Sequence, residues 1–205
     1  MRRKKFNDVL QFKITLCDIH PPVWRQIQVP DHYSFWDLHV AIQDAMGWQD
    51  YHLHKFEVFF PETAVTLRIG IPLPEKDRFD DEQDLLPGWK ESVAFCFEDR
   101  KPRITYLYDF GDDWKHAVDF EGVHSRKPGV KYPACLDGAR ACPPEDCGGP
   151  YGYVDMLKII ADKNHEEYED TVRWLKPKFD PERFDPRKVV FDNPATRWRK
   201  AFRQS

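Results

Sequence analysis

Apolar and polar residues alternate over the first thirty residues, which predicts a β-hairpin. Apolar side chains occupy every second position from Leu10 to Leu16, and a turn at His20-Pro21-Pro22 follows. Apolar residues then recur from Val23 to Val29. Successive side chains of a strand point to opposite faces, so each segment has one face for a core and one for solvent. We expect two antiparallel strands here.

The same alternation predicts a second hairpin in the middle of the chain. Residues 104–110 and 114–121 alternate on either side of Gly111-Asp112-Asp113. Glycine accepts a positive φ and aspartate hydrogen-bonds its own backbone, so this triplet is typical of a tight turn. The large apolar side chains of the two segments share one face. The hairpin is therefore expected to place that face in the core.

A helical pattern lies between the hairpins. Ser34 precedes an apolar stripe and is followed three positions later by Asp37, as at the start of a capped helix. The stripe continues to Met46, where Gly47 supplies the residue type that most often ends a helix. The sequence predicts a helix over residues 35–46.

The remaining periodic segments complete an α+β pattern. Residues 51–60 and 93–97 have the period of strands, whereas residues 153–161 and 164–175 have the period of helices. Helices packed on a sheet bury the apolar faces of both. We expect a mixed, largely antiparallel sheet of about five to seven strands packed with about three helices. We assign residues 1–205 to a single domain.

The composition narrows the class of protein. Hydrophobic residues make up 41% of the chain, enough for a core, but no run of about 18 apolar residues could span a membrane. The basic start MRRKK is not followed by the apolar segment of a signal peptide. We therefore expect a cytoplasmic protein whose five cysteines are reduced.

Charge argues against strong binding to duplex nucleic acid. The net charge is -4, whereas proteins that coat phosphate backbones are basic. An acidic segment, residues 75–99, and a basic one, residues 171–205, could attract each other. Residues 192–205 form a basic aromatic tail at the end of the basic segment.

A long loop rich in proline, glycine and cysteine follows the second hairpin. No strand or helix period is evident from residue 123 to 150, more than the roughly 12 to 15 residues usual for a structureless loop. Cys135, Cys142 and Cys147 lie in it and could hold a structural zinc, with His116 as a fourth ligand. The alternative is that these cysteines are buried thiols, and that His116 is a neutral core histidine. The sequence leaves both open.

Two further histidines, His52 and His54, are expected on one face of the strand over residues 51–60. Side chains at i and i+2 of a strand point the same way, so the two could act as a metal pair. No third ligand is adjacent in sequence. The favoured alternative is that both histidines lie at a strand end near the surface.

A candidate ligand site combines the second hairpin with the loop after it. A short connection can bring both to one cleft with aromatic walls and a few polar groups, the usual make-up of a small-ligand site. The residues of this candidate site are Tyr106, Tyr108, Asp109, Asp112, Trp114, His116, Glu145, Asp146, Gly148, Gly149 and Tyr151. The alternative is that they only lock the loop onto the sheet.

Two long motifs carry a family resemblance. The first is Y-x-Y-D-F-G-D-x-W-x-H at Tyr106–His116, and the second is P-P-E-D-C-G-G-x-x-G-Y at Pro143–Tyr153. With Gly47-Trp48, the histidines near residue 52 and the stretch 179–185, they resemble the plasmid pRiA4b ORF-3-like family over a core of about residues 6–191. The resemblance implies a single α+β domain, found on plasmids, mobile elements and chromosomes, and implies no particular reaction.

Three functions remain open at this point. The favoured one is a cytosolic binding module that holds a small ligand or a protein partner between the Tyr108–His116 hairpin and the Pro143–Tyr153 loop. A structural zinc, if bound, would hold the loop in place. The second is a metal-dependent hydrolase or nuclease. Its ligands and bases would be Asp109, Asp112, Asp113, His116, Glu145 and Asp146. The third is a nucleic-acid accessory protein of mobile elements. The sequence shows no ordered set of catalytic residues. Enzyme activity therefore stays uncertain, and the binding module is favoured over the enzyme.

Overall fold

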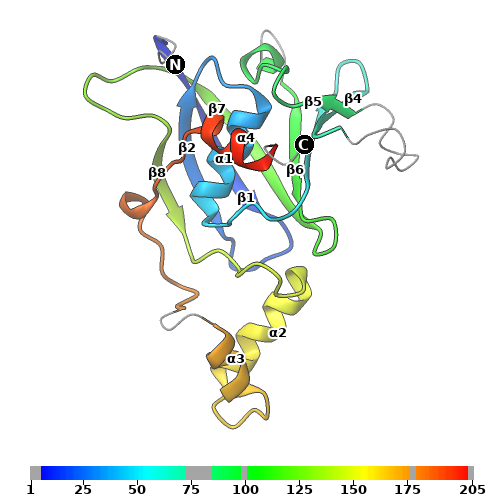
Figure 1. The fold of residues 1–205 in the computed structure, drawn as a ribbon, viewed down its shortest axis with the longest axis vertical. Helices are drawn as coiled ribbons and strands as arrows, with labels where there is room; N and C mark the ends of the chain where they lie inside the picture. The colour runs from blue at the N-terminus through cyan, green and yellow to red at the C-terminus, as the bar shows by residue number, and fades with distance from the viewer. Residues whose placement is uncertain (1–5, 73–84, 98–100, 176–178, 203–205) are drawn as a thin grey trace.

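The computed structural model describes residues 6–72, 85–97, 101–175 and 179–202 (Figure 1). The described strands form one eight-stranded sheet in the order β5-β4-β3-β6-β7-β1-β2-β8. They are β1 (Asp8–Leu16), β2 (Trp24–Pro30), β3 (His54–Phe60), β4 (Val65–Gly70), β5 (Leu85–Pro87), β6 (Arg103–Tyr108), β7 (Trp114–Ser125) and β8 (Ala134–Ala139). All neighbours pair antiparallel except β4 and β5. The α+β prediction is confirmed, with more strands than expected.

Helices cover one face of this sheet and extend from one end. The described α-helices are α1 (Phe35–Met46), α2 (Gly149–Ala161), α3 (Tyr168–Trp174) and α4 (Pro194–Ala201), with short 3-10 helices η3 (Ala94–Phe97) and η4 (Pro186–Lys188). Figure 1 shows α1 across the sheet, α4 on the outer side of α1, and α2 and α3 projecting away. Within the described ranges, no helix has the length and apolarity needed to cross a membrane.

The capping residues predicted for α1 lie at its two ends in the structure. The Ser34 side chain accepts a hydrogen bond from the main-chain N–H of Asp37 at 3.3 Å, and the Asp37 carboxylate accepts one from the N–H of Ser34 at 3.0 Å. This reciprocal capping box satisfies two N–H groups that a helix start otherwise leaves unpaired. Gly47 ends the helix at φ 94°, a conformation that glycine adopts without the steric cost of a Cβ.

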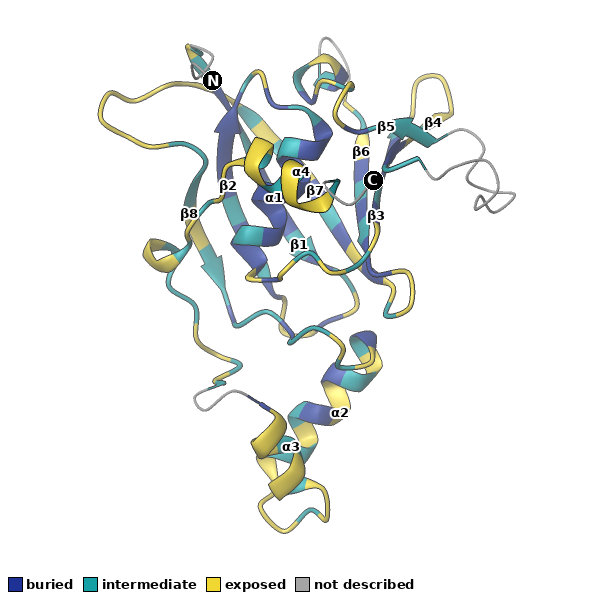
Figure 2. Cartoon of the chain, in the orientation of Figure 1, coloured by how far each residue is buried: buried dark blue, intermediate teal, exposed yellow. Residues whose placement is uncertain are grey.

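Both predicted hairpins are present and lie side by side. β1 pairs with β2 and β6 with β7, and β1 also pairs with β7, so the two hairpins form the centre of the sheet. Most of their large apolar side chains are buried together with the inner face of α1 (Figure 2), whereas Phe110, at the turn, is exposed. On the opposite face of β1 and β2, Gln11 and Gln26 both donate hydrogen bonds to Glu121. The covered face therefore supplies the core, and the other face is polar.

The loop predicted over residues 123–150 contains secondary structure, and in that respect the prediction was wrong. β7 extends to Ser125, and β8 pairs with β2 in an antiparallel register that includes Ile27 with Cys135. The side chains of β8 are half-buried or exposed and show no alternation. A strand at a sheet edge is held by main-chain hydrogen bonds to one neighbour, so apolar periodicity was absent from its sequence.

Two other expectations change. Residues 94–97 form the 3-10 helix η3 where a strand was predicted. The tail beyond residue 192 contains α4, in which Trp198 packs edge-on against Trp36 with ring centroids 5.1 Å apart and also contacts Trp89. The expected attraction to the acidic segment concerns mainly residues 73–84 and 98–100, which lie outside the described residues. The tail therefore docks on α1 through aromatic rings.

Candidate functional site

The turn between β6 and β7 directs one carboxylate oxygen of Asp109 toward His52. Asp109 adopts φ 55°, and its Oδ1 accepts hydrogen bonds from the main-chain N–H groups of Gly111 at 3.0 Å and Asp112 at 3.3 Å. Aspartate tolerates this left-handed conformation better than most residues because its short side chain bonds locally. Oδ2 is left to face His52, whose Nε2 lies 3.5 Å away.

The loop of residues 143–149 is docked against this turn, and we call the contact region the junction. Glu145 accepts hydrogen bonds from the Tyr108 hydroxyl at 2.6 Å and from the main-chain N–H of Gln49 at 3.0 Å. Trp48 donates from its indole to the Pro143 carbonyl at 2.9 Å. Burial, and then the bond to Glu145, raise the pKa of Tyr108 above its usual value. Tyr108 therefore remains the donor in this bond.

Glycine is required where the loop meets the turn. Gly149 has φ 68°, and a Cβ at this position would lie 2.4 Å from the carbonyl oxygen of Asp112. The neighbouring Gly148 donates its N–H to the Asp112 carboxylate at 3.3 Å. The two glycines therefore allow the start of α2 to approach the turn at main-chain distance.

His52, Asp109 and Asp146 converge on the exposed side of the junction. His52 Nε2 lies 3.0 Å from Asp146 Oδ1 and 3.5 Å from Asp109 Oδ2, and one ligand atom from each residue lies within 4.8 Å of the others. Nitrogen and oxygen ligands of a first-row divalent ion lie at about 2.0–2.2 Å, so neighbouring ligand atoms are about 3.0–3.5 Å apart. The spacing at His52 fits such a site. The side chains are 31%, 12% and 68% exposed, so one side faces solvent.

A second group with three potential ligands, His39, Asp50 and His54, lies nearby in the core. The two imidazoles stack with centroids 3.4 Å apart at 6°, so their in-plane lone pairs point in parallel planes and do not meet at one point. His39 Nδ1 lies 2.8 Å from the Tyr106 hydroxyl and Nε2 lies 2.9 Å from Asp50. This geometry fits a hydrogen-bonded network in the core better than it fits a metal site.

The histidine pair expected on one strand face is therefore divided. β3 begins at His54, which is buried, while His52 precedes the strand and joins the junction. The prediction that both lie near the surface was wrong for His54. Its Nδ1 has no hydrogen-bond partner in the described part of the chain, and burial lowers its pKa well below the usual value.

The expected ligand residues separate into three places. The aromatic rings of Tyr106, Tyr108 and Trp114 are buried, as is His116, so these four belong to the core, from which the Tyr108 hydroxyl reaches the junction. The polar and glycine members form the junction and are Asp109, Asp112, Glu145, Asp146, Gly148 and Gly149. Tyr151 lies on the first turn of α2 and is 89% exposed. The loop contacts already made at the junction support the reading that many of these residues lock it onto the sheet.

The cysteine set is not gathered as metal ligands. Among the described residues, the two groups with three potential ligands within 4.8 Å contain no cysteine. Burial raises the pKa of Cys135 to about 11 and of Cys147 to about 12, so these thiols are protonated at neutral pH. Zinc binding by the cysteines stays a prediction. It would require the sulfur atoms to come together and lose their protons.

Sequence reasoning missed Trp48 and Gln49 as parts of this region. Trp48 stacks on Tyr108 with ring centroids 5.0 Å apart and is itself buried. Its indole and the main-chain N–H of Gln49 each hold a residue of the docked loop. The signals were the position of Trp48 directly after the helix-ending glycine and the place of Gly47-Trp48 in the family resemblance. Neither specifies a contact with residues nearly 100 positions away.

His116 should make the protein less stable in mild acid. Its Nδ1 lies 3.3 Å from the Tyr106 carbonyl oxygen, and burial lowers its pKa to about 4. An unfolded histidine has a pKa of about 6.5, so the unfolded chain takes up the proton first as the pH falls. This group should therefore cost about 2 kcal/mol of stability between pH 7 and pH 5.

Urea unfolding of the parent and of His116→Gln at both pH values measures this loss. The parent should lose about 2 kcal/mol more than the variant over the interval, because other buried histidines contribute equally to both. Equal losses in the two proteins would contradict the assignment.

Comparisons with known proteins agree with the fold and with the two long motifs. A crystal structure of a protein of unknown function, MM3350 from Methanosarcina mazei Go1, is 45% identical, with a TM-score of 0.80 over 91% of this chain and 100% of that chain. The uncharacterized protein y4hQ from Sinorhizobium fredii (strain NBRC 101917 / NGR234) is 32% identical over 206 residues, covering 96% of this chain and 98% of that protein. The family model described as plasmid pRiA4b ORF-3-like protein matches residues 8–188, and the chain belongs to this family.

Proposed function

We propose that the protein is a metal-binding module that holds one divalent ion at the junction through His52, Asp109 and Asp146. The main support is that three ligand atoms from three separate segments converge. Asp146 Oδ1 lies 3.0 Å and Asp109 Oδ2 lies 3.5 Å from His52 Nε2. Two carboxylates close to one imidazole repel each other when both are ionised. A cation between them would remove that repulsion.

The donor set favours zinc over harder ions. An imidazole nitrogen suits zinc, whereas sites for magnesium and calcium are usually built from oxygen alone. The hydrogen bonds from Gly111 and Asp112 to Asp109 Oδ1 orient the other oxygen of that carboxylate. Such outer contacts are typical of metal ligands and add to affinity. Asp146, on the docked loop, is the most exposed of the three.

Metal binding at this place would cross-link the loop to the sheet. His52 precedes β3, Asp109 follows β6 and Asp146 lies just before α2, so one ion would connect three segments. The exposed side leaves room for a further ligand from solution. Such a module would present an open metal position at the base of α2.

Zinc titration of the untagged, chelator-treated protein under reducing conditions tests the proposal. Calorimetry should show about one zinc per chain, and zinc should raise the melting temperature. Asp146→Asn should weaken binding by about tenfold, since it removes an anionic ligand from an exposed and adaptable position. The matched control is Asp155→Asn, an exposed carboxylate on α2 that pairs with Lys158, and it should leave binding unchanged.

Two results would reject this site. One is the absence of zinc binding by the parent protein. The other is unchanged binding in Asp146→Asn together with loss of binding in Cys142→Ser, which would assign the metal to the cysteine loop.

A hydrolytic role is the second candidate, favoured by the number of protein ligands. Catalytic zinc sites keep three protein ligands and an open position for water, whereas structural sites have four. The zinc-loaded protein can be assayed with bis(p-nitrophenyl) phosphate. Turnover that Asp146→Asn abolishes and Asp155→Asn preserves would extend the function from binding to hydrolysis.

A further inference from the structure

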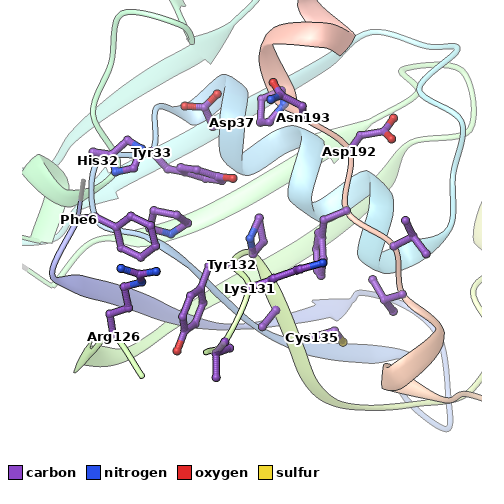
Figure 3. Close-up of a pocket in the computed structure, with 18 of the residues that line it drawn as sticks. Phe6, His32, Tyr33, Asp37, Arg126, Lys131, Tyr132, Cys135, Asp192 and Asn193 are labelled. Atoms are coloured by element: carbon purple, nitrogen blue, oxygen red, sulfur yellow. The ribbon is translucent and has the colours of Figure 1, made fainter. Parts of the chain in front are cut away.

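A large cavity lies apart from the junction, between the edge of the sheet and the C-terminal segment (Figure 3). Its volume is about 1110 Å³, just above the range of roughly 300–1,000 Å³ usual for small-molecule sites. Its walls come from Phe6, the start of α1, residues 126–135 and residues 186–195. No residue of the junction lines it.

One end of the cavity is aromatic. The ring of Phe6 lies 5.6 Å from the ring of His32 and 5.9 Å from that of Tyr132, measured between centroids. His32 in turn contacts Tyr33 edge-on at 5.8 Å. Figure 3 shows these side chains grouped on one side of the cavity, away from Asp192 and Asn193. The Phe6 and Tyr132 rings stand at 87° to each other, so a flat ligand can stack on one ring and meet the edge of the other.

The same end carries positive charge without a matching carboxylate. The Arg126 guanidinium lies over the Phe6 ring at 4.9 Å from its centroid. Lys131 also lines the cavity, and Figure 3 shows its side chain directed away from Arg126. Among the described residues, neither forms an ion pair. The guanidinium is held in place by the ring, and its N–H groups remain available for an anion.

The acidic residues of the cavity are already engaged. The Asp37 carboxylate accepts the hydrogen bond from Ser34 that caps α1. Asp192 Oδ2 pairs with Arg197 at 2.8 Å. The cavity therefore combines an aromatic surface with the Arg126 guanidinium, which pairs with none of the carboxylates among the described lining residues.

We propose that this cavity binds an aromatic ring that carries an anionic group, the chemistry of a nucleoside monophosphate. The base stacks on one of the two perpendicular rings, Phe6 or Tyr132, and meets the edge of the other, and the phosphate takes hydrogen bonds from Arg126. Base stacking on aromatic side chains and charge-assisted bonds from arginine to phosphate are each strong enough to locate such a ligand. The site is independent of the metal proposed at the junction.

Calorimetric titration of the full chain with AMP, GMP, CMP and UMP tests the proposal, with adenosine and inorganic phosphate as partial ligands. At least one monophosphate should bind, and adenosine and phosphate should each bind at least tenfold more weakly. Arg126→Met should weaken monophosphate binding by at least tenfold. The matched control is Lys127→Met, which removes the adjacent charge outside the cavity and should leave binding unchanged.

Further variants and probes keep the test decisive. If Arg126→Met does not fold, as judged by its melting temperature, Arg126→Gln replaces it with the same expectation. A single-stranded oligo(dA) hexamer that binds more tightly than AMP, with strong salt dependence, would identify the source as a nucleic-acid strand. Equal affinities for the oligo(dA) hexamer and for AMP would identify a free nucleotide as the ligand. The proposal is overturned if no monophosphate binds at millimolar concentration, or if the cavity variant and Lys127→Met behave alike.

Discussion

Replacing Asp109 by asparagine is expected to weaken zinc binding at the junction by about 100-fold, or about 2.8 kcal/mol, with little loss of stability. Asparagine keeps a carbonyl oxygen that can accept the N–H groups of Gly111 and Asp112, and it tolerates the φ of 55° at this position. It removes the negative charge that faces His52. The effect should exceed that at Asp146, because Asp109 is the less exposed and better oriented ligand.

Calorimetry and urea unfolding of two Asp109 variants separate the metal role from the turn role. Asp109→Ala loses the turn acceptor as well and should also unfold about 1–2 kcal/mol more easily without metal. Asp109→Asn should differ from the parent protein mainly when zinc is present. Zinc affinity equal to that of the parent in Asp109→Asn would remove Asp109 from the ligand set.

Replacing Arg25 by methionine is expected to lower the free energy of unfolding by about 3 kcal/mol. Arg25 is buried and donates hydrogen bonds to the main-chain carbonyls of Ala45 at 2.9 Å, Trp24 at 2.7 Å and Ala139 at 2.9 Å. It thereby connects the end of α1 to β2 and β8. Methionine would fill the space and leave these buried acceptors without their donor.

The charge of Arg25 also sits on an aromatic ring. Its guanidinium lies 3.7 Å from the centroid of Phe184, and burial lowers its pKa. Arg25→Lys should therefore recover only part of the stability, because one ammonium group cannot reproduce the planar fork. Urea unfolding measures all three proteins. The control is Arg173→Met on α3, where the side chain is exposed and no measurable change is expected. A loss below about 1 kcal/mol in Arg25→Met would contradict the role assigned to the hydrogen bonds.

Arg25 also illustrates why some determinants of the fold were not evident in the sequence. An arginine within an alternating strand segment is usually expected on the solvent side, yet here it faces the core. Its acceptors are main-chain carbonyls, which every residue type provides. Nothing in the residue pattern therefore marks Ala45 and Ala139 as its partners.

The junction was predicted in part for a similar reason. The hairpin turn and the docked loop were expected to meet, because a short connection joins them and both contain turn-forming residues. The structure adds His52 and Trp48 from the segment between α1 and β3, which sequence distance had separated from both. The grouping of His52 with Asp109 and Asp146 depends on where β3 begins, and the strand period does not determine that boundary.

The sequence by itself determined the elements whose signals are local. The capped helix α1, the two central hairpins and their buried faces follow from side-chain period, capping residues and turn chemistry, all of which act within a few positions. Only the tertiary structure decided β8, the docking of α4 and the cavity beside Phe6. β8 is held by main-chain pairing to β2, which leaves no apolar pattern, and α4 is held by rings that meet Trp36 and Trp89 from distant parts of the chain. Such contacts depend on positions in space, and a one-dimensional pattern contains no record of them.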